Sequence, residues 1–86
     1  MPEISRFLGI VITMYFNDHN PPHFHVRYGE SRAAIAIQSL EVMTGILPAR
    51  VLGLVTEWAS IHRETLLKNW TQMATSGTFE PIAPLV

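Results

Sequence analysis

The sequence predicts an α+β fold, in which an antiparallel β-meander of three or four strands packs on one long C-terminal α-helix. Between residues 7 and 43, β-branched and aromatic residues recur in short runs separated by turn residues, which is typical of strands. From Pro48 to about Ser76 the apolar residues instead recur with a helical period. The chain has 86 residues, so residues 1–86 are expected to form a single domain.

Three strands are expected in the first half of the chain. Residues 7–16 read as a buried strand, and the following NDHNPP ends it because neither proline can donate to a β-ladder. Residues 23–28 alternate cleanly between apolar and polar side chains. Gly29-Glu30 suits a two-residue type II′ hairpin loop, which leads into a returning strand over residues 32–37.

The predicted hairpin fixes which side chains share a face. It pairs Arg27 with Arg32 and places the apolar residues of both strands on the inner face. His23, His25 and Arg27 then lie together on the outer face, because residues two apart on a strand point the same way. Small alanines opposite the imidazoles predict a shallow depression beside them.

The second half is expected to be mainly helical. A fourth short strand over residues 40–43, with a turn at Thr44-Gly45, would precede the helix. Pro48 suits the first helical position, and Gly77 suits the residue just past the end. On a helical wheel, His62 and Asn69 fall in the middle of the buried stripe, so both are candidate buried polar residues. The tail, residues 78–86, is expected to pack as an extended strap.

Composition narrows the functional classes. The chain has no cysteine, which excludes a disulfide framework, a thiolate nucleophile and a cysteine-based zinc site. Its net charge of −1 gives no indication of a nucleic-acid or anionic-membrane partner, and residues 7–16 are too short to span a bilayer. Only 15% of residues are charged, which favours self-association or a protein partner.

The stretch FNDHNPPHFHVRYGES holds three of the four histidines and supports a metal hypothesis. Neutral imidazoles at His23 and His25 can both bind a divalent transition metal, with His19 or Asp18 from the preceding loop as the third ligand. The competing interpretation is that these are solvated side chains on an exposed strand, and it carries more weight, so no cofactor is the first expectation.

The same histidines support a catalytic alternative. His23 and His25 could act as general acid and base on RNA or another phosphoester, with Arg27 holding the phosphate. The acidic net charge argues against a nucleic-acid substrate. No phosphate-binding glycine loop or hydrolase motif accompanies them, so the sequence leaves open whether the protein is an enzyme.

The predicted Arg27–Arg32 pair is the clearest indication of a ligand. Like charges directly opposite each other across a hairpin repel unless an anion or an acidic group lies between them. Tyr15 belongs to the same candidate partner or anion-binding set on the outer face. The alternative is that the two long side chains splay apart in water.

Three segments carry a resemblance to a known family. They are MYFNDHNPPHFHVRYGESRAAIAI (residues 14–37), the G-x-LP at residues 45–48, and LV-x-x-WA-x-x-H-x-x-x-L-x-x-NW (residues 54–70). On these segments the chain closely resembles small bacterial proteins of the domain of unknown function 4160 family. The family pattern includes the residues His23, His25, Trp58, His62, Asn69 and Trp70, all present here.

The resemblance implies a small cytoplasmic protein whose family has no established activity. Members are often encoded beside another small protein, and some are labelled transcriptional regulators or toxin–antitoxin-like. Together with the low charge, this predicts a non-enzymatic interaction module that binds a protein partner or a second copy of itself. A ribonuclease-like protein and a metal-binding domain are the alternatives.

Overall fold

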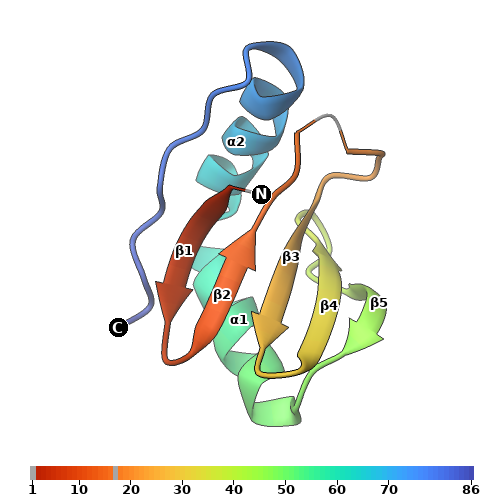
Figure 1. Cartoon of the computed structure of the whole chain (residues 1–86), viewed down its shortest axis with the longest axis vertical. Helices are drawn as coiled ribbons and strands as arrows, with labels where there is room; N and C mark the ends of the chain where they lie inside the picture. Colours follow the sequence, from red (N-terminus) through yellow and green to blue (C-terminus); the bar gives the residue numbers. More distant parts are fainter. Residues whose placement is uncertain (1, 17) are drawn as a thin grey trace.

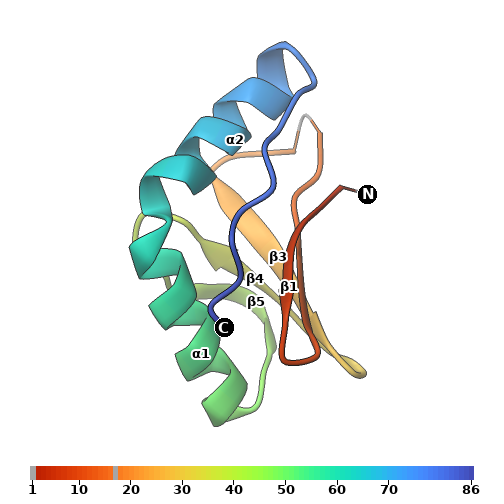
Figure 2. The same ribbon diagram turned by 90° about the vertical axis from the view of Figure 1, so that its left-hand side faces the viewer.

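The structure, a computed structural model, describes residues 2–16 and 18–86. Its elements are β1 (Glu3–Phe7), β2 (Ile10–Thr13), β3 (His23–Tyr28), β4 (Ser31–Ala36), β5 (Val42–Ile46), α1 (Ala49–Ile61) and α2 (Arg63–Thr75). The strands form one antiparallel sheet in the order β1-β2-β3-β4-β5 (Figure 1). Both helices lie along one face of that sheet (Figure 2). The α+β class is therefore confirmed, whereas the expected number of strands and the single helix are wrong.

The apolar run over residues 7–16 is not one strand. It contains the turn of a hairpin, in which Phe7 of β1 pairs with Ile10 of β2. Leu8 and Gly9 form the turn, and both have positive φ, at 52° and 79°. Two consecutive residues with positive φ are the mark of a type I′ turn, whose twist matches that of the flanking strands. The turn adds β1 as an edge strand that the sequence analysis missed.

The central hairpin agrees with its prediction. Tyr28 pairs with Ser31 around a two-residue loop, and Arg27 pairs with Arg32. Gly29 has a φ of 60°, as the first position of a type II′ turn requires. The register of β3 against β4 is therefore confirmed throughout. Asn17 of the turn expected before β3 lies outside the described residues.

The last strand begins later than expected. The sequence predicted a strand over residues 40–43 and a turn at Thr44-Gly45, but β5 runs from Val42 to Ile46 and contains both turn residues. Gly45 pairs with Ala33 of β4, next to a register shift between Ala34 and Ile35. Glycine at this point marks a close approach of two strands rather than a turn.

The predicted long helix is two helices joined at His62. This residue has φ −110° and ψ 21°, outside the helical region, and α2 continues beyond it with a bend (Figure 2). Past the joint, Arg63 donates from Nε to the carbonyl of Ile37 at 3.2 Å, which ties the start of α2 to the turn that follows β4. His62 is of intermediate burial and its ring packs on Trp58, so it lies at the margin of the predicted buried stripe rather than in its middle.

The core lies between the inner face of the sheet and the two helices. Its fully buried members include Ile10, Ile12, Met14, Phe24, Ile35, Val55, Trp58 and Leu66. Trp58 is at its centre, because the ring contacts Phe7 of β1 and Phe24 of β3 at centroid separations of 5.7 and 5.9 Å. Among the described residues, neither helix has the length and apolarity needed to cross a membrane.

The C-terminal residues run as an extended strap beside β1 (Figure 1). The Ile82 N–H donates to the carbonyl of Ile4 at 2.8 Å, and the Trp58 indole N–H donates to that of Ala83 at 2.9 Å. Asn69 has no exposed surface and bonds the strap twice. Its Nδ2 donates to the carbonyl of Glu80, and its Oδ1 accepts from the N–H of Glu80, both at 2.9 Å. Asn69 thus closes the strap onto α2.

We expect Asn69→Ala to lower the free energy of unfolding by about 2–3 kcal/mol, because two bonds are lost and the Glu80 backbone is left unpaired. Urea unfolding measures the loss, and faster proteolysis of the strap accompanies it. Lys68→Ala is the matched control, since Lys68 contacts the same Glu80 through an exposed ion pair and should cost at most about 1 kcal/mol. Equal losses in the two variants would contradict the assignment.

Candidate functional site

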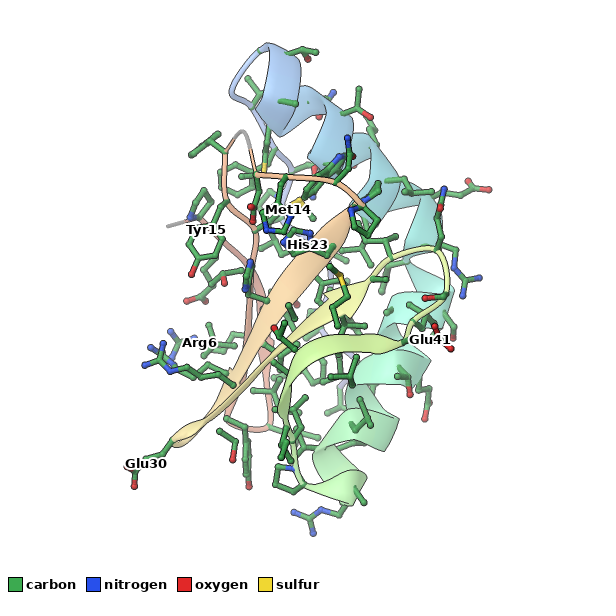
Figure 3. The ribbon with its side chains drawn as sticks, turned by 90° about the vertical axis from the view of Figure 1, so that its right-hand side faces the viewer. Arg6, Met14, Tyr15, His23, Glu30 and Glu41 are labelled. Carbon is green, nitrogen blue, oxygen red and sulfur yellow. The ribbon has the colours of Figure 1, made fainter. Side chains whose placement is uncertain are left out.

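Two adjacent rows of side chains cross the outer face of the sheet, the face turned away from the helices. The strand pairings place Glu3, Thr13, His25, Ala34 and Thr44 in one row. The next row holds Arg6, Val11, Arg27, Arg32 and Ile46. Figure 3 shows Arg6 and Tyr15 projecting from this face, away from the helices. All five strands therefore contribute to one continuous surface.

This surface is hollowed to a volume of about 320 Å³. The lining residues are Glu3, Val11, Thr13, Tyr15, His25, Val26, Arg27, Arg32, Ala33, Ala34, Thr44 and Gly45. The floor is apolar, since Val11 and Ala34 are nearly buried there although they belong to the outer face. The predicted depression is present, but its small residues are Ala33 and Ala34 rather than Ala36. The volume is at the lower end of the range for ligand sites.

Arginines give the hollow its charge. Arg27 and Arg32 face each other across β3 and β4, both exposed, as the sequence predicted. The one carboxylate of the lining, Glu3, is held by Arg6, whose Nε and Nη2 donate to it at 3.0 and 2.7 Å. That hydrogen bond, with the more distant Arg27, lowers the pKa of Glu3 against the opposing effect of desolvation. Two guanidiniums therefore line the hollow, and the single carboxylate among its described lining residues is already paired with Arg6.

Tyr15 and His25 form one side of the hollow. Their rings meet edge to face at a centroid separation of 4.4 Å. The His25 side chain is about 31% exposed, and burial is the main cause that lowers its pKa, although the carboxylate of Asp18 opposes the shift. His25 is therefore a neutral imidazole near pH 7 and offers a nitrogen lone pair.

Asp18 brings His23 and His25 together. Its Oδ2 lies 2.9 Å from Nε2 of His23 and 3.3 Å from Nε2 of His25. Its Oδ1 accepts the backbone N–H of His19 at 2.8 Å, which holds the carboxylate in place. Burial alone would raise the pKa of Asp18, but the His19 N–H and the side chains of His25, His23 and His19 lower it. The carboxylate is therefore ionised near neutral pH.

His23 is the buried member of the cluster. It is 2% exposed, its ring lies 5.1 Å from that of Trp70 on α2, and its Nδ1 lies 2.8 Å from the carbonyl oxygen of Pro21. Figure 3 shows it at the start of β3, beside α2. This position differs from the prediction of a solvent-facing pair, because the end of the strand is covered by the preceding loop and by α2. A substrate on the outer face would meet His25 and Arg27 but not His23.

The other histidines lie apart from this pair to different degrees. His19 is 77% exposed, and its Nε2 is 3.7 Å from Asp18 Oδ1, so it stands at the edge of the cluster. Asp18 rather than His19 therefore joins His23 and His25, as the three groups whose ligand atoms lie within 4.8 Å of one another. His62 packs on Trp58 at the helix joint, with a centroid separation of 5.6 Å.

Glu3 and Thr44 were not predicted as residues of the outer face, although both line the hollow. The strand β1 that carries Glu3 was not predicted, and Thr44 was placed in a turn rather than in β5.

A model of a family described as a domain of unknown function (DUF4160) matches residues 9–71, which is most of the chain. The protein belongs to this family. The match extends from the turn between β1 and β2 into α2 and so includes the Asp18–His23–His25 cluster and most of the hollow. The search of curated proteins and the search of solved structures each return no match. The DUF4160 assignment therefore defines relatives of this chain but no activity.

Proposed function

We propose that the protein is an interaction module whose outer sheet face binds an acidic segment of a partner protein. The observation that carries the proposal is the placement of Arg27 opposite Arg32 on the wall of a hollow in which Glu3, the only lining carboxylate among the described residues, is hydrogen-bonded to Arg6. Two guanidiniums at this spacing repel each other, and a partner carboxylate between them relieves that repulsion while accepting several N–H bonds.

The surroundings of the arginines favour a peptide over a nucleic acid. Ile46 lies beside Arg32 on the same row and is 83% exposed, and the hollow floor is apolar. An acidic segment that also carries an apolar side chain can contact both features. The net charge of −1 gives no long-range attraction for a polyanion such as RNA. A pairing with another small protein, in a toxin–antitoxin-like or regulatory pair, would supply such a segment.

The test uses a fluorescein-labelled peptide of alternating Glu and Val, with a Lys and Val peptide and a single-stranded RNA as the other arms. We expect the acidic peptide alone to bind, and Arg27→Gln and Arg32→Gln each to weaken binding about tenfold. Arg50→Gln is the matched control, because Arg50 is an exposed residue of α1 outside the hollow. It should bind like the wild type.

Three outcomes would overturn the proposal. One is equal binding of the acidic peptide by the Arg27, Arg32 and Arg50 variants. Another is the absence of saturable binding in the wild type. The third is preferential RNA binding with a steep salt dependence, which would indicate a nucleic-acid surface; RNA cleavage abolished by His25→Ala would then support the ribonuclease alternative.

A further inference from the structure

The three side chains of the Asp18–His23–His25 cluster converge in an arrangement that a neutral His23 ring cannot satisfy by hydrogen bonding alone. A carbonyl oxygen can only accept a hydrogen bond, so Nδ1 of His23, 2.8 Å from the Pro21 oxygen, must carry the N–H. In the neutral ring, Nε2 then has only a lone pair. Yet this Nε2 lies 2.9 Å from the Asp18 carboxylate, which also has only lone pairs to offer. A positive centre must lie between them.

We propose that this centre is a divalent transition metal, with Asp18 Oδ2, His23 Nε2 and His25 Nε2 as its protein ligands. Two imidazoles and a carboxylate are ligands that Zn²⁺ and other divalent first-row transition metals commonly use in proteins. In a tetrahedral zinc site with bonds of 2.0–2.1 Å, ligand atoms lie about 3.3 Å from each other. The two nitrogens lie 2.9 and 3.3 Å from Asp18 Oδ2, and all three ligand atoms lie within 4.8 Å of one another, which is close to the spacing that such a site needs.

The groups around the cluster support metal binding in two further ways. Metal-bound histidines usually donate their other ring N–H to a backbone carbonyl, which is the contact of His23 with Pro21. Asp18 is likewise oriented by the His19 N–H, so two of the three ligands have a fixed direction before any ion binds. Part of the His25 ring and part of Asp18 are exposed, which leaves an entry path and room for water in the remaining coordination positions.

The competing account is that His23 is a buried imidazolium paired with Asp18. In that account a proton on Nε2 of His23 and a second proton on Nε2 of His25 each donate to Asp18 Oδ2, at 2.9 and 3.3 Å. In the metal account one ion replaces both protons, and the rings of His23 and His25, 5.1 Å apart, present both nitrogens to it. The metal inference does not rest on acidic-peptide binding, and its probe is the metal alone.

The direct test is calorimetric titration of the untagged, chelator-treated protein with Zn²⁺, and separately with Ni²⁺. We expect one ion per chain, with a Kd of about 1 μM or tighter for Zn²⁺. We expect each ligand variant to weaken Zn²⁺ binding about 100-fold or more; the variants are Asp18→Asn, His23→Gln and His25→Gln. Mutation of a residue that only orients a metal ligand already lowers metal affinity about 10- to 100-fold, so loss of a ligand itself should cost at least as much. If the wild type shows no saturable Zn²⁺ binding below about 100 μM, the metal site is contradicted, and a protonated His23 paired with Asp18 is the better account.

Two controls test the ligand set. His19→Gln and His62→Gln each remove an imidazole but leave the three proposed ligands, so their affinities should stay within about threefold of the wild type. Loss of binding in His19→Gln with retention in Asp18→Asn would overturn the role given to Asp18. Because His23 is buried and its variant can misfold, ¹⁵N spectra of wild-type histidines provide a second measurement. Zn²⁺ should shift Nε2 of His23 and His25, and unchanged signals at saturation would contradict the proposal.

Discussion

Trp58→Ala is expected to lower the free energy of unfolding by about 3–5 kcal/mol, because it removes a fully buried indole from the centre of the core. The ring contacts Phe7 of β1 and Phe24 of β3, and its N–H holds the strap through Ala83. A chain of this length is typically stable by only about 4–13 kcal/mol. The variant should therefore be at the limit of folding at room temperature.

Graded substitutions separate the contributions of Trp58. Trp58→Phe keeps an aromatic ring but loses the bond to Ala83, so we expect a loss of about 1–3 kcal/mol. Ile61→Ala is the control on the same helix, because Ile61 is 63% exposed and should change stability by about 0.5 kcal/mol or less. Urea unfolding followed by far-ultraviolet circular dichroism avoids the change in tryptophan fluorescence. If Trp58→Ala lowers the free energy of unfolding by less than about 1 kcal/mol, Trp58 is not at the centre of the core.

The central hairpin could be predicted from the sequence because two independent signals agree there. The alternation over residues 23–28 sets the inner and outer faces, and Gly29 at the first loop position sets the register. A one-residue slip would bury Arg27 and expose Phe24. The register that follows brings Arg27 opposite Arg32, so the main feature of the proposed binding face was accessible from sequence.

The first hairpin could not be predicted because its turn lacks the usual residues. A type I′ turn favours Asn-Gly, and here Leu8 occupies the first position with a φ of 52°, which is uncommon for leucine. Apolar residues continue through the turn, so the run resembles one long strand. The helix break at His62 was missed for a similar reason, since neither proline nor glycine marks it and the apolar period continues across it.

The site could be predicted only in part, because its decisive contacts come from outside the strand. Strand spacing places His23 and His25 on one face, but it does not show that α2 and the loop cover His23. The sequence offered Asp18 as one of two possible third ligands, and in the structure its Oδ1 also accepts the His19 N–H of the turn. That bond leaves Oδ2 directed toward the histidines. One short side chain thus serves the turn and the cluster, which a pattern of residues does not reveal.

His25 connects the two proposed sites. Its Nε2 faces Asp18, while its ring forms the side of the hollow with Tyr15. An ion on His25 would add positive charge at one end of a surface whose other end holds Arg27 and Arg32. Zn²⁺ loading is therefore expected to strengthen binding of an acidic peptide, whereas His25→Gln should remove that effect of zinc without removing the contribution of the arginines.

Gly45→Ala is expected to destabilise the protein by about 3 kcal/mol or more, because both its backbone and its surroundings exclude a side chain. Gly45 has a φ of 83°, which costs a non-glycine residue about 1–2 kcal/mol. An added Cβ would also overlap the carbonyl oxygen of Arg32 and approach the Ala33 Cα to 2.8 Å. These are backbone atoms of β4, so relief requires β5 to move away from Arg32 and the hollow. Weaker acidic-peptide binding should accompany the loss.

Two other glycines provide matched controls for the same substitution. Gly29 has a φ of 60° but no atom within 4 Å of an added Cβ, so Gly29→Ala should cost only the backbone term of about 1–2 kcal/mol. Gly53 lies within α1 with equally open surroundings, so Gly53→Ala should stabilise the protein by about 0.5–1 kcal/mol. Urea unfolding of the three variants should therefore rank Gly53, Gly29 and Gly45 from gain to largest loss. Equal effects at Gly29 and Gly45 would show that β5 does not approach β4 as closely as the structure has it.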